Sequence, residues 1–535
     1  MPLHPPTIVI AGAGASGTLS AVHLLAVATG GRARLVLVER AAKVGGGAAF
    51  STAQLCHVLN VPASGMSAFD DDPDHFVRWL DRHGYPGAGA DFVPRRLYGH
   101  YLRDCLWLAA DHGPGDTVVD VVHDEIVDVG AENSRPRVNF SAANPLEVDA
   151  VVLATGIVPR PLPPALAGYA SHERCITDPW ADGALTRIEP FSTVTLIGTG
   201  LSAVDAALAL YENGHRGPVY AISRHGLLPR PHLSAPAGAP VPHGAAAALA
   251  RRCQGLRGPS ARGLLHQFRT LLSDSAEAGV DWREVVDMLR PVTSSLWQGL
   301  DQQEQLRFRR HLERLWNVHR HRMAPRVALR IDELRDAGLF HVHAGTVQAV
   351  QPVPGSLRLE VRLAASPRTH GWATDWLVNC TGPDPDVFRS ASPLLSGLRR
   401  RGLCGPGPLG MGTATDERGR VLGSDGRPLP WMWALGSLRQ GQLLESTAVP
   451  EIRGQAAALA LDVMNYLDDA HIGPPPRQGD GELTGQRGEP VSSPSGLDHV
   501  RGAQPPPTTA SRALVPSRSR TAMPEPPGRA AVDHS

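Results

Sequence analysis

A glycine pattern near the N-terminus constrains the fold of this chain more than any other feature. The β-forming run Ile8-Val9-Ile10 leads into Gly12-x-Gly14-x-x-Gly17, and an apolar helix follows. Such a strand, glycine turn and helix begin a βαβ unit, in which the helix N-terminus presents free N–H groups to a pyrophosphate. A second strand, Leu35–Val38, ends in Glu39, where an acid can accept hydrogen bonds from an adenosine ribose. The sequence therefore predicts a dinucleotide-binding unit.

The same design occurs a second time further along the chain. The strand Val194–Ile197 leads into Gly198-x-Gly200-x-x-Ala203, followed by an apolar helix and the strand Val219–Ile222. Where the first unit has an acid, this unit has Ser223-Arg224, and a hydroxyl and a guanidinium suit a ribose 2′-phosphate. We therefore expect FAD in the first unit and NADPH in the second. The alternative is that Arg224 is only a surface arginine.

Composition and charge argue against several other classes of protein. The 535 residues include 52 Lys and Arg and 52 Asp and Glu, so no overall field favours a nucleic acid or a membrane as partner. The six cysteines are far apart and include no CxxC pair, which argues against a metal site and a redox-active disulfide. Because no signal peptide and no bilayer-spanning apolar run are evident, we expect a cytoplasmic protein.

The predicted fold class is α/β, with two Rossmann-like domains, a helical insert and a disordered tail. We expect these parts at residues 1–163 (FAD domain, first part), 164–335 (NADPH domain with the helical insert), 336–470 (FAD domain, second part) and 471–535 (tail). Ala154-Thr155-Gly156 ends a predicted buried strand. In flavoproteins with two dinucleotide-binding domains, the chain leaves the FAD domain at such a point. The similar Cys380-Thr381-Gly382 suggests that the FAD domain has resumed there.

The segment 240–335 reads as helical, and the spacing of its aromatic residues indicates helix packing. Within it, the run His319-Arg320-His321-Arg322 is more typical of a solvated or interdomain face than of a catalytic site. From Gly473 onward, Pro, Ser, Gly and Arg dominate, which predicts disorder.

Several further motifs resemble the bacterial FAD/NAD(P)-binding protein family, which includes a flavin-dependent urate hydroxylase. The resemblance spans about residues 7–465 and rests on Gly12–Gly17, Gly47–Thr52, Leu59–Ala63, Val93–Arg95, Tyr98-Gly99, Asp178–Trp180, Gly198–Leu201, Ile222–Arg224, Gly226–Pro229 and Thr447–Arg453. Phe50 and Ser202 stand where the family more often has Tyr and Thr. More loosely, the chain is similar to N-hydroxylating flavoproteins of specialised metabolism.

The resemblance implies a single-component flavin monooxygenase that uses FAD, NADPH and O₂. It implies C- or N-hydroxylation, by way of a C4a-hydroperoxyflavin, of a small polar metabolite such as an amino acid, an amine or a purine. The expected FAD-binding residues are Gly12, Gly14, Ser16, Gly17, Glu39, Gly46, Gly47, Asn60, Ile126, Thr155, Gly156 and Gly436. The expected NADPH-binding residues are Gly198, Gly200, Leu201, Ser202, Ser223 and Arg224.

The residues that contact the substrate are less evident from the sequence. His57, Asn60, Arg95 and Glu445 are candidates for the polar groups of the pocket. Two alternatives to a monooxygenase stay open at this point. One is an NADPH-dependent reductase that passes electrons to a small molecule or a protein, and the other is a non-enzymatic regulator that senses flavin or nucleotide.

Overall fold

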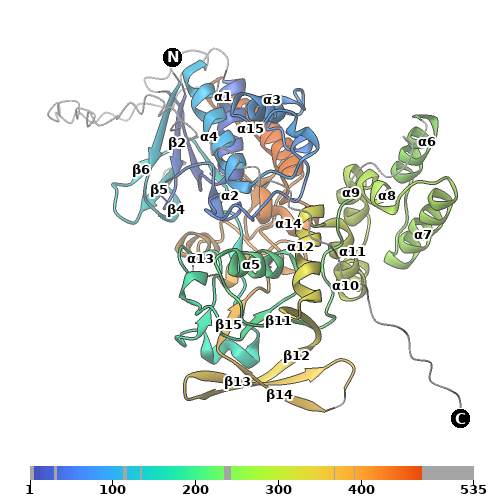
Figure 1. Ribbon diagram of the computed structural model, residues 1–535. Helices are drawn as coiled ribbons and strands as arrows, with labels where there is room; N and C mark the ends of the chain where they lie inside the picture. The colour runs from blue at the N-terminus through green and yellow to red at the C-terminus, as the bar shows by residue number, and fades with distance from the viewer. Residues whose placement is uncertain are drawn as a thin grey trace, which may run out of the picture. The chain divides into compact units, whose positions relative to one another are not determined.

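Two parallel sheets organise the chain, as the two glycine patterns predict (Figure 1). The computed structural model describes residues 5–28, 33–41, 43–112, 117–132, 135–233, 243–366, 368–390 and 392–472. The predicted α/β class with two Rossmann-like domains is confirmed. The predicted disordered tail lies outside the described residues, apart from its first two positions, which end a helix.

The first sheet has the strand order β17-β18-β7-β1-β2-β3. Its strands are β1 (Thr7–Ala11), β2 (Arg34–Val38), β3 (Val118–Val122), β7 (Ala150–Leu153), β17 (Arg420–Leu422) and β18 (Pro428–Ala434). Because β1 pairs in parallel with both β2 and β7, the glycine turn after β1 lies at the centre of the sheet's carboxyl edge. A separate antiparallel sheet contains β4 (Ile126–Glu132), β5 (Arg135–Phe140) and β6 (Leu146–Glu147).

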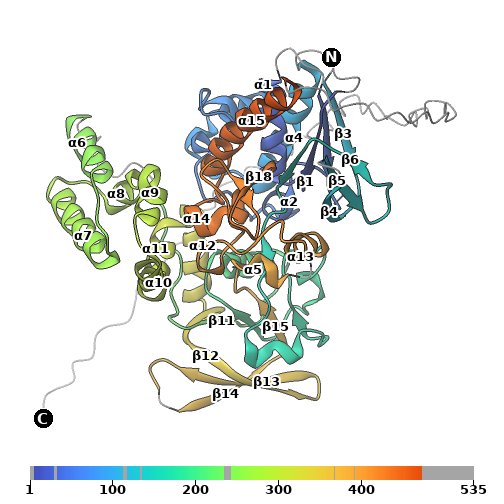
Figure 2. The ribbon, with the colours of Figure 1, turned by 180° about the vertical axis from the view of Figure 1, so that it is seen from behind.

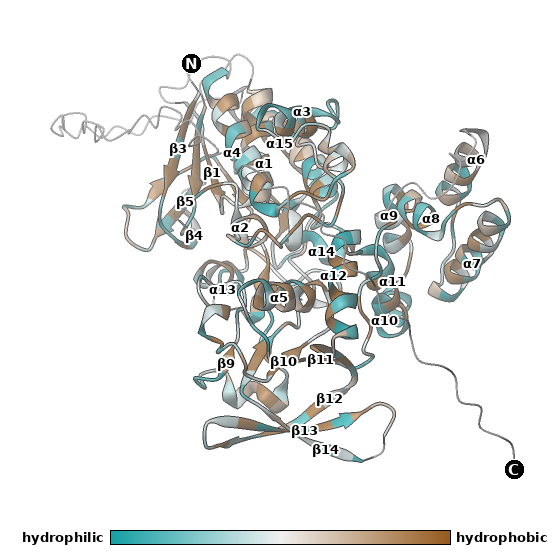
Figure 3. Cartoon of the chain, viewed as in Figure 1, coloured by the Kyte–Doolittle hydropathy of each residue, from teal (hydrophilic) through white to brown (hydrophobic). Residues whose placement is uncertain are grey.

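Three helices cover one face of the first sheet. They are α1 (Ala15–Val27), α4 (Arg95–His112) and α15 (Val449–Ile472), and α1 packs against both of the others. The side chains of β1 alternate, so that Ile8 and Ile10 join the core beneath these helices while Val9 joins the core on the opposite face. Figure 3 shows the hydrophobic character of β1 and of the strands β10 and β11 in the second sheet. Shorter helices are α2 (Gly47–Phe50), α3 (His75–Arg82), α13 (Pro393–Arg400) and α14 (Gln440–Leu443).

The second sheet has the order β14-β13-β12-β11-β10-β15-β9. Its strands are β9 (Cys175–Ile176), β10 (Val194–Ile197), β11 (Val219–Ser223), β12 (Phe340–Val353), β13 (Ser356–Leu363), β14 (Thr369–Thr374) and β15 (Trp376–Asn379). β10 pairs in parallel with β11 and β15, which repeats the arrangement of β1 between β2 and β7. The helices α5 (Leu201–Glu212) and α12 (Pro325–Asp336) pack against each other beside this sheet.

The strand pairing corrects the expected boundary at residue 336. β12 pairs with β11 and β15 pairs with β10, so residues 340–379 belong to the second sheet and not to the FAD domain. The chain returns to the first sheet only with β17 and β18. The Thr-Gly at 381-382 therefore closes the second domain, as the Thr-Gly at 155-156 closes the first. The two crossings pair side by side, as β8 (Val158–Pro159) and β16 (Pro383–Asp384).

The predicted helical insert is a separate layer of helices with a small core of its own. It contains α6 (His243–Gln254), α7 (Ala261–Glu277), α8 (Trp282–Met288), α9 (Thr293–Gln298), α10 (Gln302–His311) and α11 (Glu313–Arg320). Cys253, Leu271 and Val285 lie in this core. Figures 1 and 2 show these helices beside α12 and α14, away from the strands of both sheets.

We predict that alanine at Gly198 destabilises the second domain. Gly198 has a φ of +127°, and a Cβ there would lie 2.1 Å from the carbonyl oxygen of Cys380. The strain and the clash should lower the free energy of unfolding by about 2–4 kcal/mol, which urea titration would measure. Gly200 is the matched control, because a Cβ at that position would have no neighbouring atom within 4 Å among the described residues. Equal stability of Gly198→Ala and Gly200→Ala would contradict the prediction.

Candidate functional site

The first glycine turn brings β1 and α1 into close backbone contact. A Cβ on Gly17 would lie 1.8 Å from the carbonyl oxygen of Gly12, so this approach requires glycine. Gly14 is the N-cap of α1, and no side chain among the described residues caps the helix. The first N–H groups of α1 therefore form an N-terminus suited to a phosphate.

Two other predicted FAD residues lie beside this turn. The Glu39 carboxylate, at the end of β2, accepts a 2.9 Å hydrogen bond from the Ala13 N–H and a 3.0 Å bond from the Ala41 N–H. These bonds hold the acid at the position expected for a ribose contact. A Cβ on Gly47 would lie 3.1 Å from the Cα of Gly14, so the second glycine cluster runs along the phosphate turn.

The chain returns to this turn after β7 and after β18. A Cβ on Gly436 would lie 2.8 Å from Ser16 Oγ, at the start of α1. The Ser437 hydroxyl donates a hydrogen bond to the carbonyl oxygen of Gly156, next to Thr155. Four of the predicted residues, from three distant parts of the sequence, thus gather at one end of α1.

Two more predicted FAD residues lie close by. Gly46 is the N-cap of α2, which begins at Gly47. Ile126 begins β4 and is buried in the same core as Val9 and Val36. Contact of these residues with the cofactor stays a prediction.

The second glycine turn also leaves its helix N-terminus open. Gly200 is the N-cap of α5, without a side-chain cap among the described residues, and Leu201 and Ser202 form the first turn. Ser202 lines a cavity of about 100 Å³ together with Ala48 and Trp180. Because Ala48 follows the glycine cluster of the first unit, this cavity lies where the two dinucleotide units face each other.

The end of β11 combines a hydrogen-bonded hydroxyl with an exposed arginine. Ser223 Oγ lies 2.8 Å from Thr199 Oγ1 and accepts a 3.0 Å hydrogen bond from the Gly226 N–H. Arg224 is exposed and forms no ion pair with any residue that the structure describes. Burial lowers the pKa of the neighbouring Arg160, the charges of Asp384 and Glu313 oppose this shift, and those of Arg309 and Arg224 add to it. The exposed Arg224 guanidinium itself suits a phosphate better than a neutral hydroxyl.

A buried ion pair joins the two dinucleotide halves. Arg95, at the start of α4, lies 2.8 Å from Asp205 in α5, and the two side chains are only 10% and 7% exposed. Arg95 Nε also donates a 2.8 Å hydrogen bond to the carbonyl oxygen of Val58. Removing either charge would leave the other buried without compensation, a loss of about 3–5 kcal/mol in such pairs.

His57 and Asn60 belong to the same polar cluster. His57 Nδ1 lies 2.8 Å from Thr52 Oγ1, and Nε2 lies 3.1 Å from the carbonyl oxygen of Asp205. Burial lowers the pKa of His57, which favours the neutral ring. Asn60 Oδ1 accepts a 3.4 Å hydrogen bond from the Arg95 guanidinium.

Three of the four candidate substrate residues therefore come together, although protein atoms already engage their polar groups. This geometry favours a role in holding the two halves together over direct contact with a substrate. The sequence interpretation missed Asp205, the central acid of the cluster. Its signal was an acid inside the otherwise apolar helix segment 201–211, where a charge must find a buried partner.

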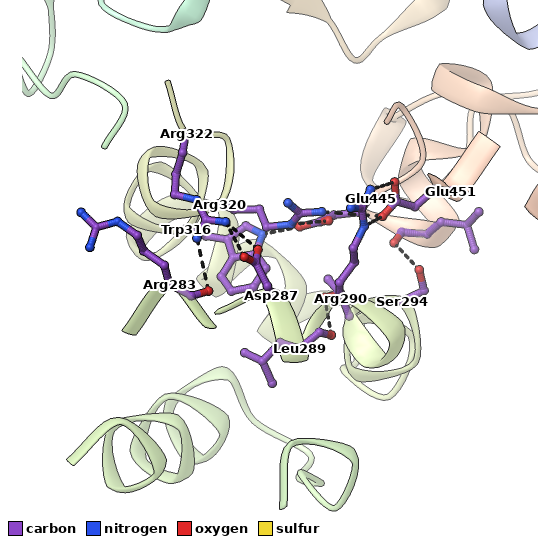
Figure 4. Close-up of polar contacts among 12 residues, drawn as sticks. Arg283, Asp287, Leu289, Arg290, Ser294, Trp316, Arg320, Arg322, Glu445 and Glu451 are labelled. Carbon is purple, nitrogen blue, oxygen red and sulfur yellow. Dashed lines mark hydrogen bonds and ion pairs between the residues drawn. The ribbon is translucent and has the colours of Figure 1, made fainter. Parts of the chain in front are cut away.

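Glu445, the fourth candidate, lies in a different polar network, shown in Figure 4. Its carboxylate accepts a 2.8 Å hydrogen bond from the Trp316 indole and a 2.9 Å bond from Arg320 Nε. The Arg320 and Glu445 side chains are 7% and 9% exposed. This pair connects α11 of the insert to the segment that precedes α15.

A second ion pair extends this network to the N-terminus of α15. The Arg290 guanidinium binds Glu451 in the first turn of α15, with one bond of 2.7 Å, and Arg320 lies 3.6 Å from the same carboxylate. Burial alone would raise the pKa of Glu451, but Arg290 and Arg320 outweigh it and lower the pKa. Two of the four residues in the run 319–322 are thus buried in ion pairs, Arg320 here and Arg322 with Asp287.

Comparisons with known proteins agree with this fold. Residues 9–158 match a family model described as FAD-NAD(P)-binding. No curated protein sequence matches. Among solved structures, ornithine hydroxylase from Pseudomonas aeruginosa in its reduced form has a TM-score of 0.59 at 15% identity, covering 87% of this chain and 100% of that one.

Two further solved structures are similar along most of their length. The Kutzneria sp. 744 ornithine N-hydroxylase, described with reduced FAD, NADP⁺ and L-ornithine, has a TM-score of 0.53 at 17% identity and covers 86% of this chain and 99% of its own. The cadaverine monooxygenase of desferrioxamine biosynthesis from Erwinia amylovora, bound to FAD, has a TM-score of 0.55 at 14% identity, with coverages of 91% and 100%. The chain has the fold of a two-dinucleotide flavoprotein.

Three other features concern metal sites, cysteine thiols and membrane spans. Among the described residues, no group of three or more His, Cys, Asp or Glu side chains has the arrangement of a metal site. All six cysteines are free, and burial raises the pKa of Cys56 to about 11. No helix in the described ranges has the length and apolar character of a membrane span.

We predict that His232 makes the fold sensitive to mild acid. His232 Nε2 lies 2.9 Å from the carbonyl oxygen of Asn60, and burial, followed by the charge of Arg322, lowers its pKa from 6.5 to about 4. Because the folded state favours the neutral ring, this contribution to stability is complete above pH 6.5 and is lost as the pH falls towards 4.

The substitution His232→Gln keeps a hydrogen-bond donor at this position but removes the titrating ring. It should reduce the loss of unfolding free energy between pH 6.5 and pH 4 by about 3 kcal/mol at most, as urea unfolding at each pH would show. His112→Gln, at a residue whose side chain is 70% exposed, is the control. Identical pH profiles for His232→Gln and the unaltered protein would contradict the prediction.

Proposed function

We propose that this chain is an FAD-dependent, NADPH-using monooxygenase that hydroxylates a small metabolite carrying an amine or a similar group. The observation that carries the proposal is the pair of open helix N-termini, α1 and α5, on two dinucleotide units that face each other. Solved structures of similar fold, which include an ornithine hydroxylase and a cadaverine monooxygenase, support the same reaction class.

The residues present fit the two cofactors. The α1 N-terminus at Gly14 would hold the FAD pyrophosphate, and Glu39 would accept a ribose hydroxyl. The α5 N-terminus at Gly200 would hold the NADPH pyrophosphate, with Arg224 at the 2′-phosphate. When bound, FAD supplies hydride acceptance and activation of O₂.

The N-terminus of α15 completes the proposed site. A helix N-terminus favours negative charge nearby, which suits the edge of a reduced flavin. Glu451 in its first turn would oppose this effect, but Arg290 and Arg320 neutralise the carboxylate. The ion-pair network therefore leaves the helix dipole available to the cofactor, while the Arg95–Asp205 pair holds the two dinucleotide units together.

The proposal is tested with purified protein loaded with FAD. We expect NADPH to bleach the flavin absorbance without oxygen, and ¹⁸O₂ to label the product when an accepted amine is added. Electron transfer to an artificial acceptor without any ¹⁸O incorporation would instead indicate a reductase. Protein that refuses FAD and does not oxidise NADPH would contradict both functions.

We predict that Arg224→Gln weakens NADPH binding and leaves NADH binding unchanged. Loss of one charge-assisted contact to a 2′-phosphate corresponds to about 1.5–3 kcal/mol, or roughly a tenfold to hundredfold rise in the Kd for NADPH. Anaerobic flavin reduction at increasing nucleotide concentration measures both values. Arg216→Gln, outside the proposed site, is the control. An equal loss for both nucleotides would contradict the assigned role.

A further inference from the structure

The helical insert forms an apolar cavity of about 380 Å³, lined by its own residues and by Leu444. This volume falls in the range of small-molecule pockets, about 300–1,000 Å³. Its walls consist mainly of leucine and aromatic side chains, including Leu265, Phe268, Trp282, Leu296 and Trp316. A cavity with this lining gains free energy by excluding water, so an apolar ligand would be favoured there.

The charges at the cavity have one sign. Of the described residues that line it, only Arg269 and His319 carry titratable side chains, and no carboxylate takes part. Arg269 is exposed and forms no ion pair with the described residues. A ligand with an apolar body and one anionic group would complement both the walls and this cation.

One wall of the cavity comes from the segment next to the proposed flavin site. Leu444 lines the cavity and has a φ of +60°, a conformation that leucine rarely adopts. Strained residues of this kind are retained mainly where surrounding contacts fix them, and they cluster at ligand sites. Leu444 lies between Gly436, which touches the phosphate turn, and the N-terminus of α15.

The insert holds this wall in place through several hydrogen bonds. Trp297 donates a 2.8 Å hydrogen bond to the carbonyl oxygen of Gly441, and Ser294 donates a 2.9 Å bond to that of Leu443. Trp316, which lines the cavity, binds the Glu445 carboxylate (Figure 4). The cavity is thus built jointly by the insert and by the segment that leads to the proposed flavin site.

We propose that this cavity binds the apolar body of the substrate, and that the substrate is an amphipathic amine with an anionic group. The inference rests on the proposed monooxygenase function and narrows its substrate class. It replaces the expected small polar metabolite by a compound whose aliphatic or aromatic part lies in the insert, with its anion near Arg269 and its amine towards α15.

The test uses the full chain loaded with FAD and two probes of known chemistry. The first, 1-anilinonaphthalene-8-sulfonate, combines an aromatic body with an anion, and its fluorescence reports binding. The second, 10-aminodecanoate, has its amine and its carboxylate at opposite ends of an apolar chain, and it should displace the first probe and accelerate NADPH oxidation. 4-Aminobutanoate, with the same polar groups and a much shorter chain, should do neither. Failure of 10-aminodecanoate to displace the first probe would overturn the inference.

Two variants test whether the probes bind in this cavity. Leu315 lines the cavity and is 43% exposed, so Leu315→Asp adds a repelling charge without emptying a core. It should raise the Kd of both probes about tenfold. Leu329→Asp, on α12 and 63% exposed, should leave the Kd unchanged. Equal effects of the two substitutions would overturn the inference.

Three further outcomes have distinct meanings. Loss of self-association in Leu315→Asp, measured by light scattering, would overturn the inference in favour of a second copy covering the cavity. Displacement of the probe without accelerated NADPH oxidation, while a small polar amine does accelerate it, would overturn the substrate role. Flavin that NADPH never reduces would refute the monooxygenase function itself, and with it the substrate role, even where the cavity binds both probes.

Discussion

The close approach of a glycine turn to the carbonyl of the next parallel strand is the constraint on which both domains depend. In the first domain a Cβ on Gly12 would lie 2.5 Å from the carbonyl oxygen of Ala154, and in the second a Cβ on Gly198 would lie 2.1 Å from that of Cys380. This contact fixes each helix start above the carboxyl edge of its sheet. The helix N-termini are free for phosphates because the backbone, and not a side chain, closes the turn.

This repeated contact also explains why the two domains could be predicted from the sequence and why the boundary between them was predicted wrongly. Both glycine turns are local patterns, so the two domains and their central strands could be read directly. The Thr-Gly after Cys380 looked like a return to the FAD domain because it resembles the Thr-Gly after Ala154. The resemblance is real, but it reflects the same structural task in the second domain, as the pairing of β15 with β10 shows.

The polar contacts between distant segments could not be read in the same way. Arg95 and Asp205 come from different domains, and Arg290 and Glu451 from the insert and the last helix, so no local pattern links either pair. Burial offers a partial signal, since an acid within an apolar helix needs a counter-charge. The same rule accounts for Arg320, which is buried and paired with Glu445. The basic run 319–322 by itself had indicated a solvated or interdomain face.

The paired crossings β8 and β16 have a mechanical consequence for the two domains. The chain passes between them twice, and both passages are joined as one antiparallel ribbon. Because the two passages pair with each other, neither can move far without the other unless this pairing breaks. A large rotation between the domains would also have to break the buried Arg95–Asp205 pair.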